Sequence, residues 1–251
     1  MKRPSYVGAI TLAIAGIAQA ADMPLKAPPP PAWSWSGCYI GGTVGGYRSS
    51  STYNGVPTGN FESAIPVLTA ISSGTFDQSG VIGGGELGCN WQAGIFVFGL
   101  EGDVSGWHNS STSAVTGPDV PAPGQLFHAT TSVTSNTLTT VRPRIGIAAN
   151  NWLFYATGGL AASNAAFSQS VFFAATRSTQ AGATSTSVGW TAGGGIEYAI
   201  TPNWTVKGEY LYVSLDNQTM TENNLAFPSF SQSATNKLAV SIGRFGVNYK
   251  F

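Results

Sequence analysis

The sequence predicts an all-β protein, an eight-stranded antiparallel up-and-down transmembrane β-barrel. Three observations support this prediction. Eight segments of 12 to 16 residues alternate apolar and polar side chains, long and short connections follow one another in turn, and only 9% of the residues are charged. No internal stretch reaches the ~20 continuous apolar residues of a membrane helix. A membrane protein of this composition would therefore cross with strands.

Residues 1–20 have the features of a secretory signal peptide. Two cationic residues near the start precede an apolar stretch at 7–18, and Ala18 and Ala20 fit a cleavage site. We therefore expect export and leave these residues out of the fold. Without them the chain has 9 Lys and Arg against 11 Asp and Glu, so its balance is slightly acidic and no nucleic-acid partner is expected.

Residues 21–35 are expected to form a Pro-rich periplasmic linker. The stretch 21–32 contains five prolines, which favour extended polyproline conformation over a sheet. The barrel is expected to span 36–251.

The connections between the predicted strands alternate in length. The strands are expected at 37–48, 79–91, 95–107, 135–149, 152–167, 185–200, 203–216 and 236–251. Long connections fall at 49–78, 108–134, 168–184 and 217–235, and tight turns at 92–94, 150–151 and 201–202. Both ends of the barrel then lie beside the tight turns. Bacterial outer-membrane barrels have this layout, with short periplasmic turns and longer outer loops.

Side-chain alternation sorts each strand into an apolar and a charged face. In the third strand Phe98 and Leu100 oppose Glu101 and Asp103. We expect the apolar face to contact lipid and the charged face to fill the lumen, because buried charges of opposite sign must pair. The predicted interior charge network consists of Glu86, Glu101, Asp103, Arg142, Arg144, Glu197, Lys207, Glu209 and Arg244.

Aromatic residues near strand ends favour the same orientation, because they form girdles at membrane interfaces. They are Trp91, Trp107, Trp152, Tyr198, Trp204 and Tyr249.

Two places fit the alternation poorly. In the last strand the apolar parity changes between Ile242 and Phe245, which a bulge or a segment beyond the membrane would explain. Pro143 lies inside the fourth strand, where it cannot donate to a ladder, so a local bulge is expected there.

The two cysteines of the chain are predicted to form a disulfide. Cys38 lies near the start of the first strand and Cys89 near the end of the second, on the apolar parity of both. Antiparallel pairing brings these ends together, and disulfides persist after export.

Three segments resemble a known group of proteins. They are WSWSGCYIGGTVGG at 33–46, GGGIEYAITPNWTVKGEYLYVSL at 193–215 and the tail GRFGVNYKF. Together they resemble the small alphaproteobacterial outer-membrane porin-like proteins, the RopB and opacity-type group, and more loosely OmpA-type barrels. The resemblance implies an eight-stranded outer-membrane barrel without a transferable catalytic motif. It also implies that the barrel assembly machinery recognises an alternating C-terminal signal, Phe245, Val247, Tyr249 and Phe251.

No residues are predicted to catalyse a reaction or to bind a cofactor or metal. The two histidines, His108 and His128, both fall in the second long connection without a ligand set at metal spacing. Glu101 and Asp103 share a face, but a structural ion-pair role is favoured over acid–base catalysis. The glycine runs at 83–85 and 193–195 lack the Lys-Ser/Thr of a phosphate loop.

Three functions remain as hypotheses. The favoured one is a structural protein of the outer membrane that contacts lipid and lipopolysaccharide and presents its loops at the surface. The second is a small passive channel, although eight strands leave an interior that side chains about fill. The third is a lipid-modifying enzyme. The sequence leaves the oligomeric state open.

Overall fold

The computed structural model describes residues 33–59, 74–118, 126–173, 177–223 and 230–251. All regular structure in these ranges is β-strand. None of the described residues forms a helix long and apolar enough to cross a membrane. The predicted signal peptide and most of the predicted linker lie outside the described residues.

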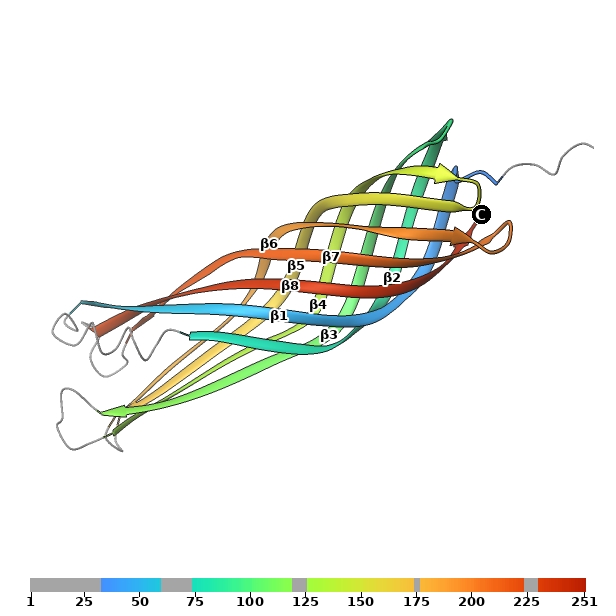
Figure 1. Ribbon diagram of the computed structural model, residues 1–251. Helices are drawn as coiled ribbons and strands as arrows, with labels where there is room; N and C mark the ends of the chain where they lie inside the picture. Colours follow the sequence, from blue (N-terminus) through green and yellow to red (C-terminus); the bar gives the residue numbers. More distant parts are fainter. Residues whose placement is uncertain (1–32, 60–73, 119–125, 174–176, 224–229) are drawn as a thin grey trace, which may run out of the picture. The chain divides into compact units, whose positions relative to one another are not determined.

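Eight antiparallel strands form a closed barrel in chain order, and the last strand pairs with the first (Figure 1). The strands are β1 (Gly37–Gly59), β2 (Gly74–Ala93), β3 (Phe96–Pro118), β4 (Leu126–Ala149), β5 (Trp152–Phe173), β6 (Arg177–Ala199), β7 (Trp204–Asn223) and β8 (Phe230–Lys250). The predicted fold class and strand number are confirmed.

Three short turns connect β2 to β3, β4 to β5 and β6 to β7 at one end of the barrel, here called the turn end. Gly94 and Asn150 adopt positive φ angles of 62° and 54° in the first two turns. Glycine and asparagine tolerate this conformation better than other residues. The C-terminus lies at the same end, where the Phe251 N–H donates to Cys38 O.

The strands continue much farther toward the opposite, outer end than predicted. They contain 20 to 24 residues each, and much of each predicted long connection belongs to a strand. The prediction of strand ends was wrong because Ser, Thr, Gly and Asn were taken as loop residues. Pairing along the hairpins satisfies their backbone groups, and β-branched threonine suits a strand.

The two faces of the wall follow the predicted alternation. In β3, Phe98 and Leu100 are about half exposed at 48% and 50%, whereas Glu101 is 2% exposed. The apolar face therefore points outward and the charged face inward. Trp107 is a correction to the predicted girdle: it shares the inward parity of Glu101 and is 4% exposed.

Neither predicted bulge is present. The β7–β8 register is continuous from Trp204↔Tyr249 to Leu215↔Leu238, and the β3–β4 register runs unbroken through Leu100↔Pro143. The change of apolar parity in β8 has another cause, because Leu238, Val240 and Ile242 point into the lumen. Register shifts occur nearer the outer end, between residues 106 and 109, 135 and 138, and 215 and 218.

The glycine run at 83–85 lies inside β2 and serves strand packing. Gly84 points inward, where an added Cβ would lie 2.1 Å from Val104 O. Adjacent Gly85 points outward, and its nearest neighbour would be Gly41 O at 3.8 Å. Only a glycine at position 84 lets β2 approach β3 this closely.

Candidate functional site

The interior of the barrel holds all nine side chains of the predicted charge network. Each is 5% exposed or less. They come from six strands, β2, β3, β4, β6, β7 and β8, so only the closed wall brings them together. Residues 101 and 244 are 143 positions apart in the chain, yet the Glu101 and Arg244 side chains approach to 3.8 Å.

Glu101 is the centre of one half of the network. Its Oε1 lies 2.5 Å from Arg142 Nη2. Its Oε2 lies 3.2 Å from Arg144 Nη1 and 2.9 Å from Lys207 Nζ. The Tyr39 hydroxyl also donates to Oε2 at 2.6 Å. One carboxylate thus forms ion pairs with three buried cations, which need such partners in a low-dielectric interior.

Arg244 organises the other half. Its Nη1 lies 3.1 Å from Asp103 Oδ1, and its Nη2 lies 2.6 Å from Glu209 Oε2. Arg142 joins the two halves, because its Nη2 also lies 3.1 Å from Asp103 Oδ2. Glu197 closes the network toward the turn end, with Oε2 2.7 Å from Arg144 Nη2.

Glu86 is the least supported carboxylate. Its Oε2 lies 2.7 Å from Lys207 Nζ and 3.8 Å from Arg244 Nη2. Its Oε1 has no hydrogen-bond partner among the described residues. The network contains five carboxylates against four cations, so Glu86 is the member whose charge is easiest to remove.

Two tyrosines that the sequence analysis did not single out complete this network. The Arg144 guanidinium lies 4.0 Å from the ring centroid of Tyr155 and 5.8 Å from that of Tyr39. The Tyr155 hydroxyl donates to Glu209 Oε1 at 3.0 Å. Both tyrosines have the inward parity of their strands, so side-chain alternation could have placed them in the lumen.

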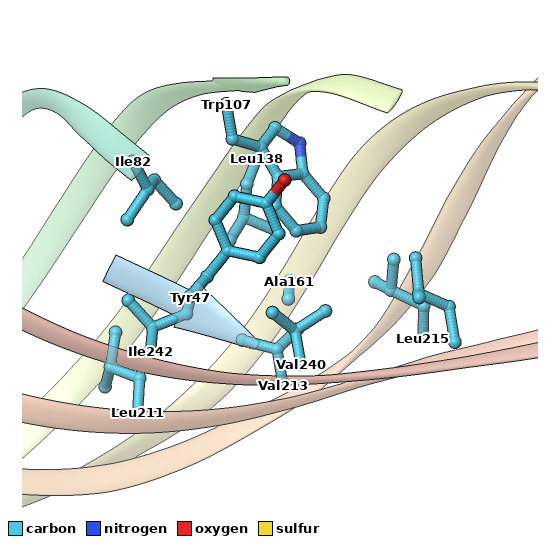
Figure 2. Packing of buried hydrophobic residues seen from close by; sticks show 11 residues of the cluster. Tyr47, Ile82, Trp107, Leu138, Ala161, Leu211, Val213, Leu215, Val240 and Ile242 are labelled. Atoms are coloured by element: carbon cyan, nitrogen blue, oxygen red, sulfur yellow. The ribbon is translucent and has the colours of Figure 1, made fainter. Parts of the chain in front are cut away.

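A layer of apolar side chains, here called the outer apolar cluster, lies in the lumen directly beyond the charges toward the outer end. Figure 2 shows its side chains gathered between the strands. On β8 Ile242 follows Arg244 by one inward position, and on β7 Leu211 follows Glu209 in the same way. The cluster consists of Tyr47, Ile82, Trp107, Leu138, Ala161, Leu211, Val213, Leu215, Leu238, Val240 and Ile242. Charges alone were expected in the lumen from the sequence, and this layer corrects that expectation.

Aromatic rings tighten the outer apolar cluster. Tyr47 and Trp107 meet edge to face with ring centroids 5.0 Å apart (Figure 2). The Tyr47 hydroxyl donates to His108 O at 2.6 Å. Its polar tip is therefore satisfied while its ring stays in the apolar layer.

A second apolar layer, the turn-end cluster, lies on the other side of the charges. Trp35 is 1% exposed and packs with residues of β3, β5 and β6, namely Val97, Leu153, Tyr155 and Ala199. The backbone N–H of Trp35 donates to Gln92 Oε1 at 2.7 Å, and Lys250 Nζ lies 4.4 Å from the Trp33 ring centroid. Trp33 and Trp35, predicted as linker, thus contact the barrel directly.

Cys38 and Cys89 form the predicted disulfide. They are direct cross-strand partners of β1 and β2, with Cα atoms 4.0 Å apart. Both side chains have the outward parity and lie near the turn end, away from the charge network.

The two histidines do not share a site. Both lie on strands and are exposed. His128 is paired with Thr116, its Nδ1 lying 2.9 Å from Thr116 Oγ1. Position 116 is eight residues beyond His108 on β3, which corresponds to roughly 27 Å along a strand. In the described ranges no group of three or more His, Cys, Asp or Glu side chains could hold a metal ion.

The residues of the predicted assembly signal form one outward row along the end of β8 and the residue that follows it. They are Phe245, Val247, Tyr249 and Phe251, with exposed fractions of 75%, 48%, 41% and 72%. Their aromatic and aliphatic surfaces are available to lipid in the folded barrel. Recognition by the assembly machinery stays a prediction.

Residues 8–251 match a protein family described as outer membrane protein beta-barrel domain. The 31 kDa outer-membrane immunogenic protein of Brucella melitensis is 34% identical to the chain, over 98% of each sequence. The 22 kDa outer membrane protein of Rhizobium leguminosarum is 28% identical, over 87% of this chain and 81% of that protein.

Among solved structures, the outer membrane protease OmpT of Escherichia coli is similar in fold. The TM-score is 0.50 at 8% sequence identity, and the match covers 88% of this chain and 98% of that one. At this identity the likeness concerns the fold alone.

Proposed function

Since the chain belongs to the outer membrane protein beta-barrel domain family, we propose that it is a non-conducting structural protein of the outer membrane whose outer end takes part in surface interactions. The turn end then faces the periplasm and the outer end faces the outside of the cell.

The observation that carries this proposal is the filled lumen. Three layers occupy it in succession: the turn-end cluster, the charge network and the outer apolar cluster. A passing ion would have to break buried ion pairs and then cross the largely apolar outer cluster, and both steps are costly. The layers favour a plug over a pore.

The alternative of a small passive channel is tested by conductance in planar bilayers. We expect the refolded protein to insert without stable current steps. Gel migration before and after boiling would verify in parallel that the inserted protein is a folded barrel. Stable, reproducible steps from folded protein would overturn the non-conducting proposal.

We also propose that the protein is not an enzyme, in keeping with the names of its relatives. OmpT is named a protease, but this concerns that protein. The separation of His108 from His128 argues against a shared histidine site. Loss of a measured lipid-modifying activity in His108→Ala or His128→Ala would contradict this view.

A surface role is supported by the long outer ends of the strands and by the word immunogenic in the name of the Brucella relative. Lipopolysaccharide and outer-membrane lipid are the proposed neighbours of the outward apolar face. Protease treatment of intact cells is expected to cut the outer connections. Full resistance, with cleavage only after lysis, would contradict the proposed orientation.

The C-terminal row is the proposed contact for the assembly machinery. Replacing Phe251 by Ala is expected to slow assembly in cells several-fold while leaving refolding into detergent unchanged, because Phe251 lies outside the lumen. Pulse-chase labelling with heat-modifiability would measure both. Equal assembly rates in cells would remove this role from Phe251.

A further inference from the structure

The eight strands close the barrel over only part of their length. Pairing between β2 and β3 ends at Ile82↔Trp107, and pairing between β6 and β7 ends at Gly189↔Leu215. The other six strand pairs continue to the outer end. Beyond these rungs the described strands form two four-stranded sheets, β7-β8-β1-β2 and β3-β4-β5-β6 (Figure 1).

The free edges of these two sheets differ in charge. The edge of β2 carries Asp77, and the edge of β7 carries Asp216 and Glu222. By contrast, 109–117 of β3 and 178–188 of β6 contain no charged residue and no proline. Charges and prolines are the usual protection of a sheet edge against strand addition. On the β3–β6 sheet a proline and a charge occur only at the outer tips of these two edges, as Pro118 and Arg177.

Two side chains show which way the β3 backbone points. His108 O accepts a hydrogen bond from the Tyr47 hydroxyl of β1, and Ser110 O accepts one from Gln78 Nε2 of β2, at 2.5 Å. Both carbonyls therefore point toward the gap beside β3. Backbone groups alternate sides along a strand, so those of residues 112, 114 and 116 point into the gap as well.

The contacts of β3 with β4 agree with this direction. Thr112 lies opposite Ser132 and Thr116 opposite His128, and their side chains are joined at 3.4 and 2.9 Å. The ladder with β4 continues to the end of the strand. The gap-facing N–H and C=O groups at 112, 114 and 116 have no strand partner among the described residues.

We propose that 109–117 of β3 binds an extended, weakly charged segment of another protein, which adds to the sheet as a further strand. Only another extended backbone matches alternating donors and acceptors over the about 14 Å from residue 112 to residue 116. Ala114, Thr112 and Thr116 are small and exposed, which leaves space for larger side chains on the added strand. An anionic lipid headgroup would need cations that this segment lacks.

This inference rests on the proposed function, because the segment must face the outside of the cell. The test uses the full-length barrel in lipid nanodiscs and a fluorescent peptide of about ten alternating Thr and Val residues. We expect saturable binding by fluorescence anisotropy. Raising NaCl from about 50 mM to about 500 mM should change the affinity less than about twofold, since no charges are involved.

Ala114→Pro removes one gap-facing N–H without touching the β4 ladder. It should weaken binding about tenfold, and Ala114→Val should stay within about twofold of wild type, because it keeps the N–H. The same peptide with every second backbone nitrogen methylated should bind wild-type protein about tenfold more weakly. This second measurement needs no variant, so it holds even if Ala114→Pro fails to fold.

Several outcomes would overturn the inference. They are absence of saturable binding, equal binding of the methylated peptide, displacement of the peptide by lipopolysaccharide, and a wild-type dimer that Ala114→Pro abolishes. The dimer would make a second copy the occupant. Protease access on intact cells separates the two proposals: a buried segment would defeat the proposed function, whereas an accessible segment without peptide binding defeats this inference alone.

Discussion

The charge network and the outer apolar cluster fill neighbouring levels of one lumen by different physics. On β7 Glu209 belongs to the first and Leu211 to the second, and on β8 the same change occurs between Arg244 and Ile242. The network is held by ion pairs of 2.5 to 3.8 Å that depend on one another. The cluster is held by close packing and exclusion of water.

The comparison shows what a barrel in lipid demands of its interior. Lipid covers the outward apolar face, so the lumen does not have to supply the main hydrophobic burial. Either charges or apolar groups can fill it, provided that buried charges are paired and voids are avoided. The two layers should therefore respond differently to loss of one side chain.

Glu101→Ala is expected to have the largest effect. Arg142, Arg144 and Lys207 would lose their shared carboxylate in a dry interior, which costs about 3–5 kcal/mol when one partner of a buried pair is removed. Urea unfolding in lipid vesicles would measure the change. A loss below about 1 kcal/mol would mean that the remaining carboxylates or water compensate.

Leu138→Ala should have a smaller but clear effect. Leu138 is 1% exposed in the outer apolar cluster, and truncation leaves a cavity that costs about 2–4 kcal/mol. Leu160→Ala is the matched control, because Leu160 is 66% exposed on the outward face and leaves no enclosed cavity. Equal losses in the same unfolding experiment would show that the cluster is loosely packed.

Glu86→Gln tests whether the members of the charge network contribute unequally to stability. It removes the least supported of five carboxylates and leaves four against four cations, so stability should change by less than about 1 kcal/mol. The temperature at which the folded form is lost on gels would be measured for Glu86→Gln and for Glu101→Gln. The two temperatures would rank the two positions. A Glu86→Gln loss equal to that of Glu101→Gln would disprove the ranking of contacts given above.

Arg48→Ala is expected to have the smallest effect on the free energy of unfolding. The Arg48–Asp77 pair bridges β1 and β2 at 3.3 Å, with side chains 76% and 54% exposed. Solvent screens such pairs, so the expected change is within about 0.5 kcal/mol. A larger loss in urea unfolding would indicate that the outer part of these strands contributes more to stability than its exposure suggests.

Several features were predictable because they depend on local patterns. The alternation of Phe98 and Leu100 with Glu101 fixed the faces of β3, and the same rule assigned the whole charge network. Leu211, Val213 and Leu215 share the parity of Glu209, so the outer apolar cluster was within reach of the same rule. It was missed because apolar residues were assumed to face lipid.

The sequence by itself determined the two faces of each strand, the short turns and the strand order that pairs Cys38 with Cys89, since each follows from neighbours along the chain. Only the tertiary structure decided that Trp35 packs into the turn end and that the wall divides beyond Ile82 and Gly189. The first depends on contacts with β3, β5 and β6, which are distant in sequence, and the second on where pairing stops within two hairpins. Side-chain parity repeats every two residues and carries no information on where pairing between two strands stops.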